Sequence, residues 1–244
     1  AIWDARKKRL LLARDRFGQK PLYYRLADGS CHFASEIKGI LEDPDVEREV
    51  DPLALHSFLS HAYVPCPRTA IKGISKLPPA HVLSIEADGR SELRRYWRLY
   101  MGPKRGGWAA RDLRRAEGEL LSLLDEATQL RMISDVPLGA FLSGGVDSSA
   151  IVASMREAQQ GGKADAIRTF AIGFEEQAYD ESPHARVVAN RLGTEHTELI
   201  LGPESFGGLE KIVWHYGEPY ADASALPTFA VSKLAREHVT VALT

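Results

Sequence analysis

Cysteine is scarce in this sequence, and its cysteines and histidines do not have the spacing of a metal site. Only two cysteines occur among the 244 residues, Cys31 and Cys66, and they form no CxxC pair. The eight histidines form no HExxH or HxH pattern. We therefore expect neither a zinc site nor a disulfide framework, and a reducing, cytoplasmic compartment is the simplest inference.

Long apolar segments and an excess of one charge are missing as well. No apolar run approaches the about 20 residues that a helix needs to cross a membrane. The opening AIWDARKKRLLLARD has no signal-peptide core. The 31 basic and 33 acidic side chains give a formal net charge of -2, which provides no positive field for a nucleic-acid backbone. The sequence therefore predicts no membrane and no nucleic acid as a partner.

The first part of the chain alternates short β-like runs with turn signals, which favours a hairpin-rich layer. Asp51 followed by Pro52 has the pattern of an N-cap with proline at the first helical position, and predicts a helix as far as about Ser60. The β-like runs lie at residues 9–14, 22–26, 31–35 and 70–85, and a short helix is predicted at 36–42. The run MGPKRGGW at residues 101–108 then breaks all periodicity, so we place a boundary there, between a first domain at 1–100 and a second at 108–244.

The second part has the pattern of an α/β fold. Apolar residues spaced three and four apart predict one buried face on a long helix from about residue 109. They are Leu113, Ala116, Leu120, Leu123, Ala127, Leu130 and Ile133. Apolar strands then alternate with helices, which predicts a parallel sheet covered on both faces. The strands are expected at residues 138–142, 169–174, 196–201 and 239–244, and the helices are expected to begin near Asp147, Asp180, Pro203 and Pro227.

The run SGGVDSS at residues 143–149 joins the first of these strands to its helix, which is where open parallel sheets bind ligands. Gly144 and Gly145 have no Cβ, so they let the backbone adopt positive φ and approach a ligand closely. The first turn of the helix has amide hydrogens without partners and about half a positive charge from the helix dipole. The loop is therefore a candidate anion site.

Polar side chains of the same loop strengthen this interpretation. The hydroxyls of Ser143, Ser148 and Ser149 add three donors, while the carboxylate of Asp147 would hold Mg²⁺ or orient the loop. A strand-to-helix turn with serine or aspartate as N-cap, and no ligand, is the structural alternative. No Gly-Lys-Ser/Thr follows a GxxxxG frame, so the loop is not a Walker A motif, and transfer of the terminal phosphate is the less natural chemistry.

SGGVDSS resembles the PP-motif of the adenine-nucleotide α-hydrolase superfamily, in which the loop holds the β,γ-pyrophosphate of ATP while an oxygen attacks the α-phosphorus. The longer run SDVPLGAFLSGGVDSS, with TFAIGF and YDES after it, is similar to the synthetase domain of class II glutamine-hydrolysing asparagine synthetases. Upstream, ARDRFGQKPLYY and FASEIKG resemble the last part of their N-terminal glutaminase domain. The resemblance implies a β-rich remnant of an N-terminal nucleophile glutaminase domain, followed by a doubly wound parallel sheet of the α-hydrolase type.

The resemblance also implies the cofactors ATP and Mg²⁺ and the small-molecule substrates aspartate, glutamine and ATP. ATP would be bound by Leu142, Ser143, Gly144, Gly145, Val146, Asp147, Ser148 and Ser149. Ile172 would touch the adenine, although a core position in its strand explains it equally well. Asp180, Glu181, Glu218 and Asp222 resemble the family's pattern, with a substrate or Mg²⁺ role weighed for each against helix capping and solvation.

The implied reaction is amidation of aspartate by glutamine-derived ammonia, through a β-aspartyl-AMP intermediate. The family's glutaminase nucleophile is an N-terminal cysteine, which neither Cys31 nor Cys66 matches, and its second acidic loop is not found before Thr244. The catalytic residues therefore stay unknown, and we expect the chain alone to be inactive. Two other functions remain open: a related amidotransferase with another carboxylate acceptor, and a nucleotide-binding scaffold without turnover. A homodimer is open as well.

Overall fold

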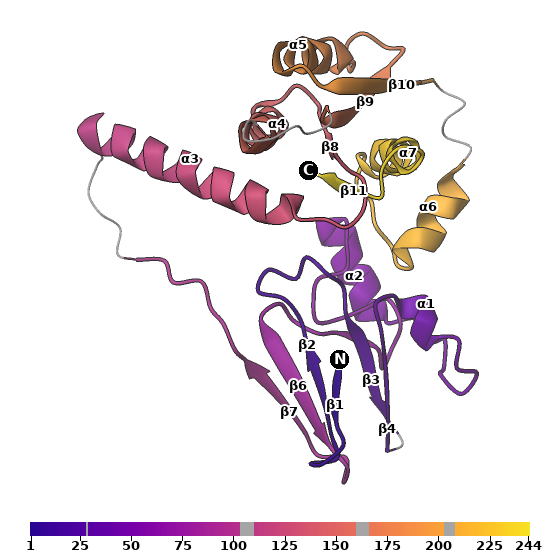
Figure 1. The fold of residues 1–244 in the computed structure, drawn as a ribbon. Helices are drawn as coiled ribbons and strands as arrows, with labels where there is room; N and C mark the ends of the chain where they lie inside the picture. Colours follow the sequence, from indigo (N-terminus) through magenta and orange to yellow (C-terminus); the bar gives the residue numbers. More distant parts are fainter. Residues whose placement is uncertain (28, 103–109, 160–165, 203–207) are drawn as a thin grey trace. The chain divides into compact units, whose positions relative to one another are not determined.

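The computed structural model describes residues 1–27, 29–102, 110–159, 166–202 and 208–244, and Figure 1 shows their helices and strands. Contacts divide the chain into two compact units, Ala1–Pro103 with Glu210–Asp222, and Lys104–Leu209 with Ala223–Thr244. The predicted boundary run at residues 101–108 falls mostly outside the described residues. Within the described part of the chain, no helix is both long and apolar enough to cross a membrane.

The first unit contains two antiparallel sheets, which confirms the hairpin-rich layer. One sheet has the order β1-β2-β6-β7 and the other β4-β3-β5. Buried apolar side chains form one cluster around Leu12, Leu77 and Leu83 and another around Ile37 and Ile40. The strands are β1 (Ile2–Asp4), β2 (Arg9–Ala13), β3 (Tyr23–Ala27), β4 (Ser30–Ala34), β5 (Ser75–Lys76), β6 (His81–Glu86) and β7 (Ser91–Arg95).

Helix α2 (Pro52–His61) of the first unit begins at a capped N-terminus. The carboxylate of Asp51 accepts hydrogen bonds from the amides of Leu53 (2.9 Å) and Ala54 (3.4 Å), and Pro52 is the first helical residue, as predicted. The helix ends at Ala62, which has a left-handed backbone with φ of 64°. The helices are α1 (Ile37–Ile40), α2 (Pro52–His61) and, except for its first residue, α6 (Leu209–Tyr216).

The second unit is a parallel sheet with the order β10-β9-β8-β11. Side chains of β9 alternate between its faces: Ala171 belongs to the cluster with α4 and α5, whereas Phe170 belongs to the cluster with α7. Helices therefore cover both faces, and the α/β prediction is confirmed. The elements are α3 (Ala110–Met132), β8 (Leu138–Phe141), α4 (Val146–Gln159), β9 (Arg168–Phe174), α5 (Ser182–Leu192), β10 (Glu195–Leu201), α7 (Ala225–Arg236) and β11 (Val241–Leu243).

Two details of the predicted helices need correction or restriction. The start expected near Pro203 lies outside the described residues, and the helix that follows, α6, belongs almost entirely to the first unit. The apolar face predicted to be buried on α3 is exposed: Leu113, Leu120, Leu123, Leu130 and Ile133 are 55% to 82% accessible, while Ala116 and Ala127 are half-buried.

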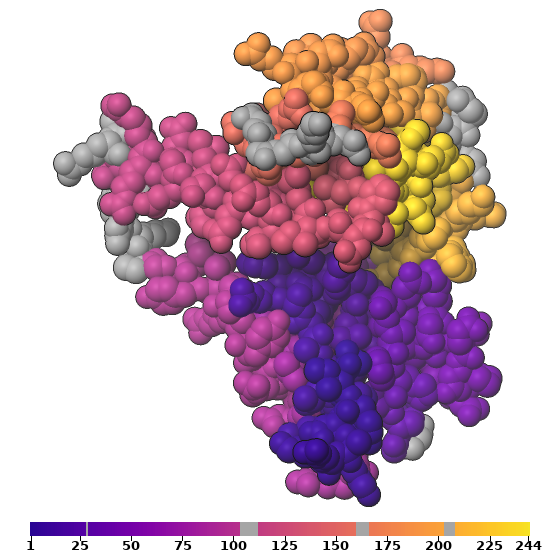
Figure 2. Space-filling model, in the orientation of Figure 1, coloured from indigo at the N-terminus to yellow at the C-terminus, as the bar shows by residue number. Residues whose placement is uncertain are grey.

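Helix α3 packs instead through another side. Thr128 is buried, and Asp125 accepts a hydrogen bond of 2.5 Å from the hydroxyl of Ser154 on α4. Figure 2 shows the pink surface of α3 open to solvent on the face turned to the viewer. The spacing of apolar residues shows that a helix has an apolar side. It does not show which other part of the chain, if any, packs against that side.

Candidate functional site

The predicted anion loop lies at the carboxyl end of β8, as expected. Leu142 follows the strand directly, is 1% exposed, and donates its amide hydrogen to the carbonyl of Phe170 on β9, at 2.9 Å. Helix α4 begins only four residues later, at Val146. The turn is therefore attached to the sheet at one end and to a helix N-terminus at the other, which is the arrangement that binds anions in parallel sheets.

The two glycines of the loop differ in backbone conformation, and of the two only Gly144 adopts positive φ. Gly144 has φ of +79°, and a Cβ built on it would lie 2.5 Å from the backbone nitrogen of Ala185 and the carbonyl carbon of His184, in α5. Gly145 does not adopt positive φ, and its nearest neighbour would be the hydroxyl of Ser143 at 3.3 Å. Gly144 is therefore required by the backbone and by the close approach of α5, whereas Gly145 only keeps the surface open.

Hydroxyl groups hold the turn together from inside. Ser148 Oγ accepts a hydrogen bond from the amide of Ser143 (3.2 Å), lies 3.1 Å from Ser143 Oγ, and donates to the carbonyl of Gly145 (3.3 Å). Ser143 Oγ in turn accepts from the amide of Gly145 at 3.3 Å. Ser149 Oγ is buried and has no hydrogen-bond partner in the described part of the chain. Two of the three predicted donor hydroxyls thus also shape the loop.

Backbone donors remain at the start of α4. Of the hydrogen bonds between described residues, none uses the amide hydrogen of Gly144, Val146 or Asp147. Such first-turn amides have no carbonyl partner within the helix, and the helix dipole adds about half a positive charge. Val146 is 85% exposed and Asp147 is exposed too, so an anion has access to these donors.

Asp147 fits Mg²⁺ only together with a nucleotide. In the described residues, no group of three or more His, Cys, Asp and Glu side chains could hold a metal ion by itself. Asp147 is exposed and supplies a single carboxylate beside the anion loop. Mg²⁺ is usually held by one or two carboxylates together with phosphate oxygens of the substrate. A Mg²⁺ ion at Asp147 would therefore need phosphate oxygens of a ligand to complete its coordination.

Asp180 connects the end of β9 to the start of α5. Its Oδ1 atom accepts hydrogen bonds from the amides of Ser182 (3.0 Å) and Phe174 (3.4 Å). Hydrogen bonds from the Ser182 amide and hydroxyl are the main cause of a pKa of the Asp180 carboxyl below its usual value. The residue expected at the N-cap was Asp180, but Glu181 occupies that position and makes no side-chain cap bond. The helix starts one residue later than the sequence suggests, and Asp180 bonds its first amide.

Gly173 is a residue that the sequence interpretation missed. A Cβ on it would lie 2.5 Å from Ile200 Cδ1, 2.7 Å from Asp180 Oδ1 and 3.0 Å from Ser182 Oγ. A glycine inside a strand often marks such a close approach, so the run TFAIGF contained the signal. Gly144 and Gly173 together let the first turn of α5 lie against the ends of β8 and β9.

Ile172 lies two residues beyond Phe170 on β9, toward the same carboxyl end of the sheet as the loop. Its side chain is half-buried and packs against the cluster of Phe170 and Val231 on the α7 face. The core explanation of this residue therefore has direct support, and contact with adenine remains a prediction.

Comparison with known sequences matches this site to one family. Residues 119–244, which include the anion loop and β9, match the family described as Asparagine synthase. The chain belongs to the asparagine synthase family. Residues 1–97 of this asparagine synthase family member also match a family described as Glutamine amidotransferase domain.

The relatives of this chain are longer than the chain itself. It is 35% identical to asparagine synthetase [glutamine-hydrolyzing] 1 of Bacillus subtilis over 243 residues, 99% of this chain but 37% of that protein. It is 36% identical over 245 residues to putative asparagine synthetase 2 of Methanocaldococcus jannaschii, 99% of this chain and 46% of that one. Amidase chyE of Penicillium rubens is 30% identical over 95% of this chain and 35% of its own length. The chain thus spans less than half of each relative. A solved NH3-dependent NAD synthetase from Campylobacter jejuni, 15% identical, aligns over 49% of both chains with a TM-score of only 0.33.

Another acidic candidate, Asp222, belongs to the first unit, whereas the residues of the anion loop belong to the second. It is exposed, and its Oδ2 atom accepts a hydrogen bond of 3.1 Å from the hydroxyl of Tyr220. Glu218, four residues earlier, is paired with Lys76 and is mostly buried. Sequence order alone would have grouped both with the second domain.

The two cysteines of this chain differ in exposure: Cys31 is half-buried and Cys66 is exposed. Burial raises the pKa of the Cys31 thiol, and burial likewise raises the pKa of Cys66. Both groups therefore hold less of the nucleophilic thiolate than a free cysteine would at neutral pH. That neither cysteine is the glutaminase nucleophile remains a prediction.

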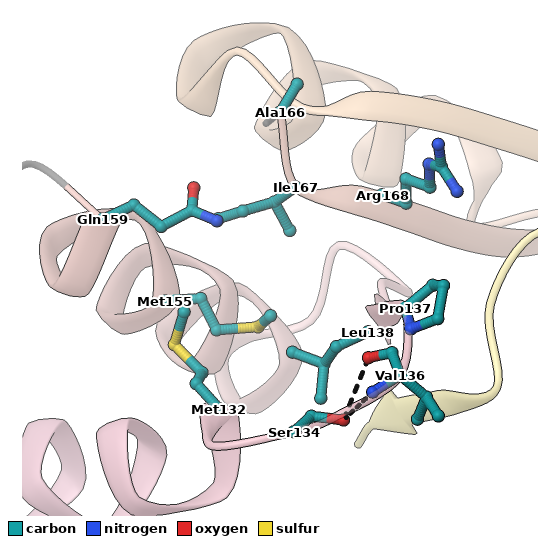
Figure 3. Close-up of a pocket in the computed structure, with 10 residues that line it drawn as sticks. All are labelled: Met132, Ser134, Val136, Pro137, Leu138, Met155, Gln159, Ala166, Ile167 and Arg168. Carbon is teal, nitrogen blue, oxygen red and sulfur yellow. Dashed lines mark hydrogen bonds between the residues drawn. The ribbon is translucent and has the colours of Figure 1, made fainter. Parts of the chain in front are cut away.

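A pocket of about 380 Å³ lies at the opposite end of the second unit's sheet from the anion loop (Figure 3). Leu138 and Arg168, the first residues of β8 and β9, line it together with the thioether side chains of Met132 and Met155. Ser134, also in its wall, uses its hydroxyl for bonds with the backbone of Val136. Parallel sheets bind ligands at the carboxyl ends of strands, so we assign no substrate to this pocket.

Proposed function

We propose that the protein containing this chain makes asparagine from aspartate, with ATP and ammonia derived from glutamine. The β-carboxylate of aspartate attacks the α-phosphorus of ATP, pyrophosphate leaves, and β-aspartyl-AMP forms. Ammonia then attacks the acyl carbon and AMP leaves. The observation that supports this most strongly is the anion loop at residues 142–149 in a chain of the asparagine synthase family.

The loop suits loss of pyrophosphate because its donors are fixed before ATP arrives. The amides of Gly144, Val146 and Asp147 would bond phosphate oxygens, and the close contact of Gly144 with α5 keeps them in place. Donors aimed in advance at developing negative charge are the most effective form of electrostatic catalysis. Mg²⁺, beside Asp147, would supply further charge neutralisation to the departing group.

Several finer points belong to the same proposal. The first domain would be the end of a glutamine amidotransferase domain at 1–100 and the second an adenylating domain of the α-hydrolase type at 108–244. Residues 210–222 would be an exception, because they pack with the first unit. Ile172 would contact adenine, and Asp180, Glu181 and Asp222 remain candidates for a substrate or Mg²⁺ role. We also propose a cytoplasmic location and leave a homodimer as an option.

An isotope experiment tests the reaction. The protein that carries this chain is incubated with ATP, glutamine and aspartate labelled with ¹⁸O in its β-carboxylate. We expect AMP and pyrophosphate, with one ¹⁸O atom in the phosphate of AMP, because the attacking oxygen stays on phosphorus when the adenylate breaks down. Release of ADP and phosphate, or AMP without label, would refute the acyl-adenylate.

A different acceptor is the second candidate, because amidase chyE is 30% identical over 95% of this chain. The two candidates share the adenylating site and differ only in the carboxylate. Label transfer to AMP from another carboxylic acid, with none from aspartate, would select the second.

A further inference from the structure

The segment at residues 210–222 lies within the part matched by Asparagine synthase, yet it packs with the unit matched by Glutamine amidotransferase domain. We propose that Lys76 positions Asp222 through Glu218 and Tyr220, so that the ammonia-producing half holds a carboxylate of the synthetase half. Any catalytic role of Asp222 in this inference rests on the proposed function. The attachment of residues 210–222 to the first unit, which we call the anchor, does not depend on it.

The centre of the anchor is a buried ion pair. Lys76 ends β5, and its Nζ atom pairs with Oε1 of Glu218; the two side chains are only 13% and 12% exposed. Nζ also donates to the carbonyl of Val64, so the lysine is fixed to its own unit. Removal of one member of a buried pair leaves a charge without compensation, whereas removal of both does not. The position of Glu218 therefore depends on Lys76.

Backbone contacts continue the anchor beyond Glu218. The amide of Ala221 donates to the carbonyl of Ala62 at 2.8 Å, and Tyr220 forms an antiparallel bridge with Tyr63. The ring of Tyr220 also stacks on Tyr216, with centroids 4.3 Å apart. Tyr220 is therefore held by two contacts, one with Tyr216 at the end of α6 and one with Tyr63, which follows α2.

Tyr220 contributes to the orientation of Asp222. The phenol hydroxyl of Tyr220 donates to Oδ2 of Asp222 at 3.1 Å, and Asp222 is exposed. A hydrogen bond to a charged acceptor is stronger than one between neutral groups and sets its orientation. The ion pair of Lys76 with Glu218 and the bond of Tyr220 to Asp222 are thus linked by the short stretch of backbone from residue 218 to residue 220.

A second attachment fixes the other end of the segment. Lys38 of α1 places its Nζ atom 3.7 Å from the ring centroid of Trp214 in α6, and donates to the carbonyl of the same residue at 3.2 Å. Glu36 pairs with Lys38 at 2.7 Å. Since both ends of residues 214–222 are attached to the first unit, a shift of that unit would move Asp222 with it.

Hydrogen exchange measured by mass spectrometry tests the anchor without any activity. Glu218→Gln is the deciding variant, because it keeps the shape of the side chain and removes its charge. We expect amides of residues 211–222 to exchange about tenfold faster in Glu218→Gln and in Lys76→Met, and the double variant Lys76→Met with Glu218→Leu to return to within about threefold of wild type. Lys72→Met is the matched control, since Lys72 forms an exposed pair with Glu49.

The outcomes of the exchange experiment decide the matter. Wild-type exchange of residues 211–222 in Glu218→Gln overturns the anchor, as does equal acceleration in Lys72→Met. Should Lys76→Met lose protection throughout the chain, the isosteric Glu218→Gln still gives the answer.

Kinetics test the link to Asp222 in the protein that carries this chain. We expect Tyr220→Phe to raise KM for aspartate by about tenfold, because Asp222 loses one hydrogen bond to its charged carboxylate. Glu218→Gln should raise KM for aspartate in the same direction, and both variants should leave KM for ATP unchanged. Wild-type KM for aspartate in both variants overturns the positioning role. If the wild type forms no aspartate-dependent AMP, the proposed function fails instead, and the exchange result stands by itself.

Discussion

Replacement of Gly144 by alanine is the sharpest test of the anion loop. At φ of +79° a residue with a Cβ loses about 1–2 kcal/mol relative to glycine. The new Cβ would also lie 2.5 Å from backbone atoms of His184 and Ala185, which cannot rotate away as a flexible side chain can. Overpacking of this kind costs about 1–3 kcal/mol. We therefore expect Gly144→Ala to lower the free energy of unfolding by about 2–5 kcal/mol.

Gly145→Ala is the matched control, because its φ is not positive and its nearest contact, Ser143 Oγ, is at 3.3 Å. Its effect on stability should stay below about 1 kcal/mol. Three of the four tryptophans, Trp3, Trp97 and Trp214, belong to the first unit, so tryptophan fluorescence would not report the second unit alone. Urea unfolding, monitored by hydrogen exchange in peptides that contain β8 and α5, would detect the loss of stability.

Gly144→Ala should also weaken nucleotide binding more than Gly145→Ala does. If Gly144→Ala moves the loop away from α5, the competent arrangement is less populated, and the Kd for Mg-ATP should rise at least about tenfold for each 1.4 kcal/mol of bias. Isothermal calorimetry with Mg-ATP measures this. A Gly144→Ala protein as stable as Gly145→Ala, with the same Kd, would refute both the loop geometry and its role.

Three further predictions concern neighbouring groups of the second unit. Asp125→Ala should lower the free energy of unfolding by about 1–3 kcal/mol, because it leaves the hydroxyl of Ser154 buried without its acceptor; Glu126→Ala, an exposed neighbour, should not, and equal urea midpoints by circular dichroism would contradict this. Burial lowers the pKa of His196 from 6.5, so the fold is stabilised above that pH, where the imidazole is neutral, and this contribution is lost as pH falls. His196→Gln should therefore flatten the fall in stability between about pH 6.5 and 5. An unchanged slope of stability against pH would count against this assignment. The pKa of Asp180 is lowered from 3.8, so its contribution is present above that pH and is lost below; Asp180→Asn should be less stable than wild type at pH 7, and the two should converge in acid, whereas a constant difference down to the lowest pH would oppose the assignment.

Local patterns in the sequence were enough to predict the elements around the loop. Continuous apolar runs placed β8 and β9, and the turn between strand and helix followed from the glycines and serines of residues 143–149. Each of these features depends on neighbours within a few positions. The difference between Gly144 and Gly145 could not be predicted, because it arises from contact with His184 and Ala185, some forty residues later.

The exposed side of α3 shows a second limit. Leucines at steps of three and four gave the helix correctly, and its extent agrees with the prediction. Burial of those leucines needs a facing surface, and the described residues bring α4 to another side of the helix, through Thr128 and the bond between Asp125 and Ser154. The spacing of apolar residues is a property of one segment, whereas their burial also depends on the segment that packs against it.

Asp222 illustrates why the assignment of site residues is harder than the assignment of elements. Its sequence position, between α6 and α7, favours the second domain, but four contacts of its segment, at Lys38, Ala62, Tyr63 and Lys76, attach it to the first unit. None of those partners lies within 130 positions of Asp222, so no local pattern could reveal them. If the carboxylate serves the synthetase reaction, its position is a property of the amidotransferase half. Sequence order would then assign the residue to the wrong half while still identifying the right chemistry.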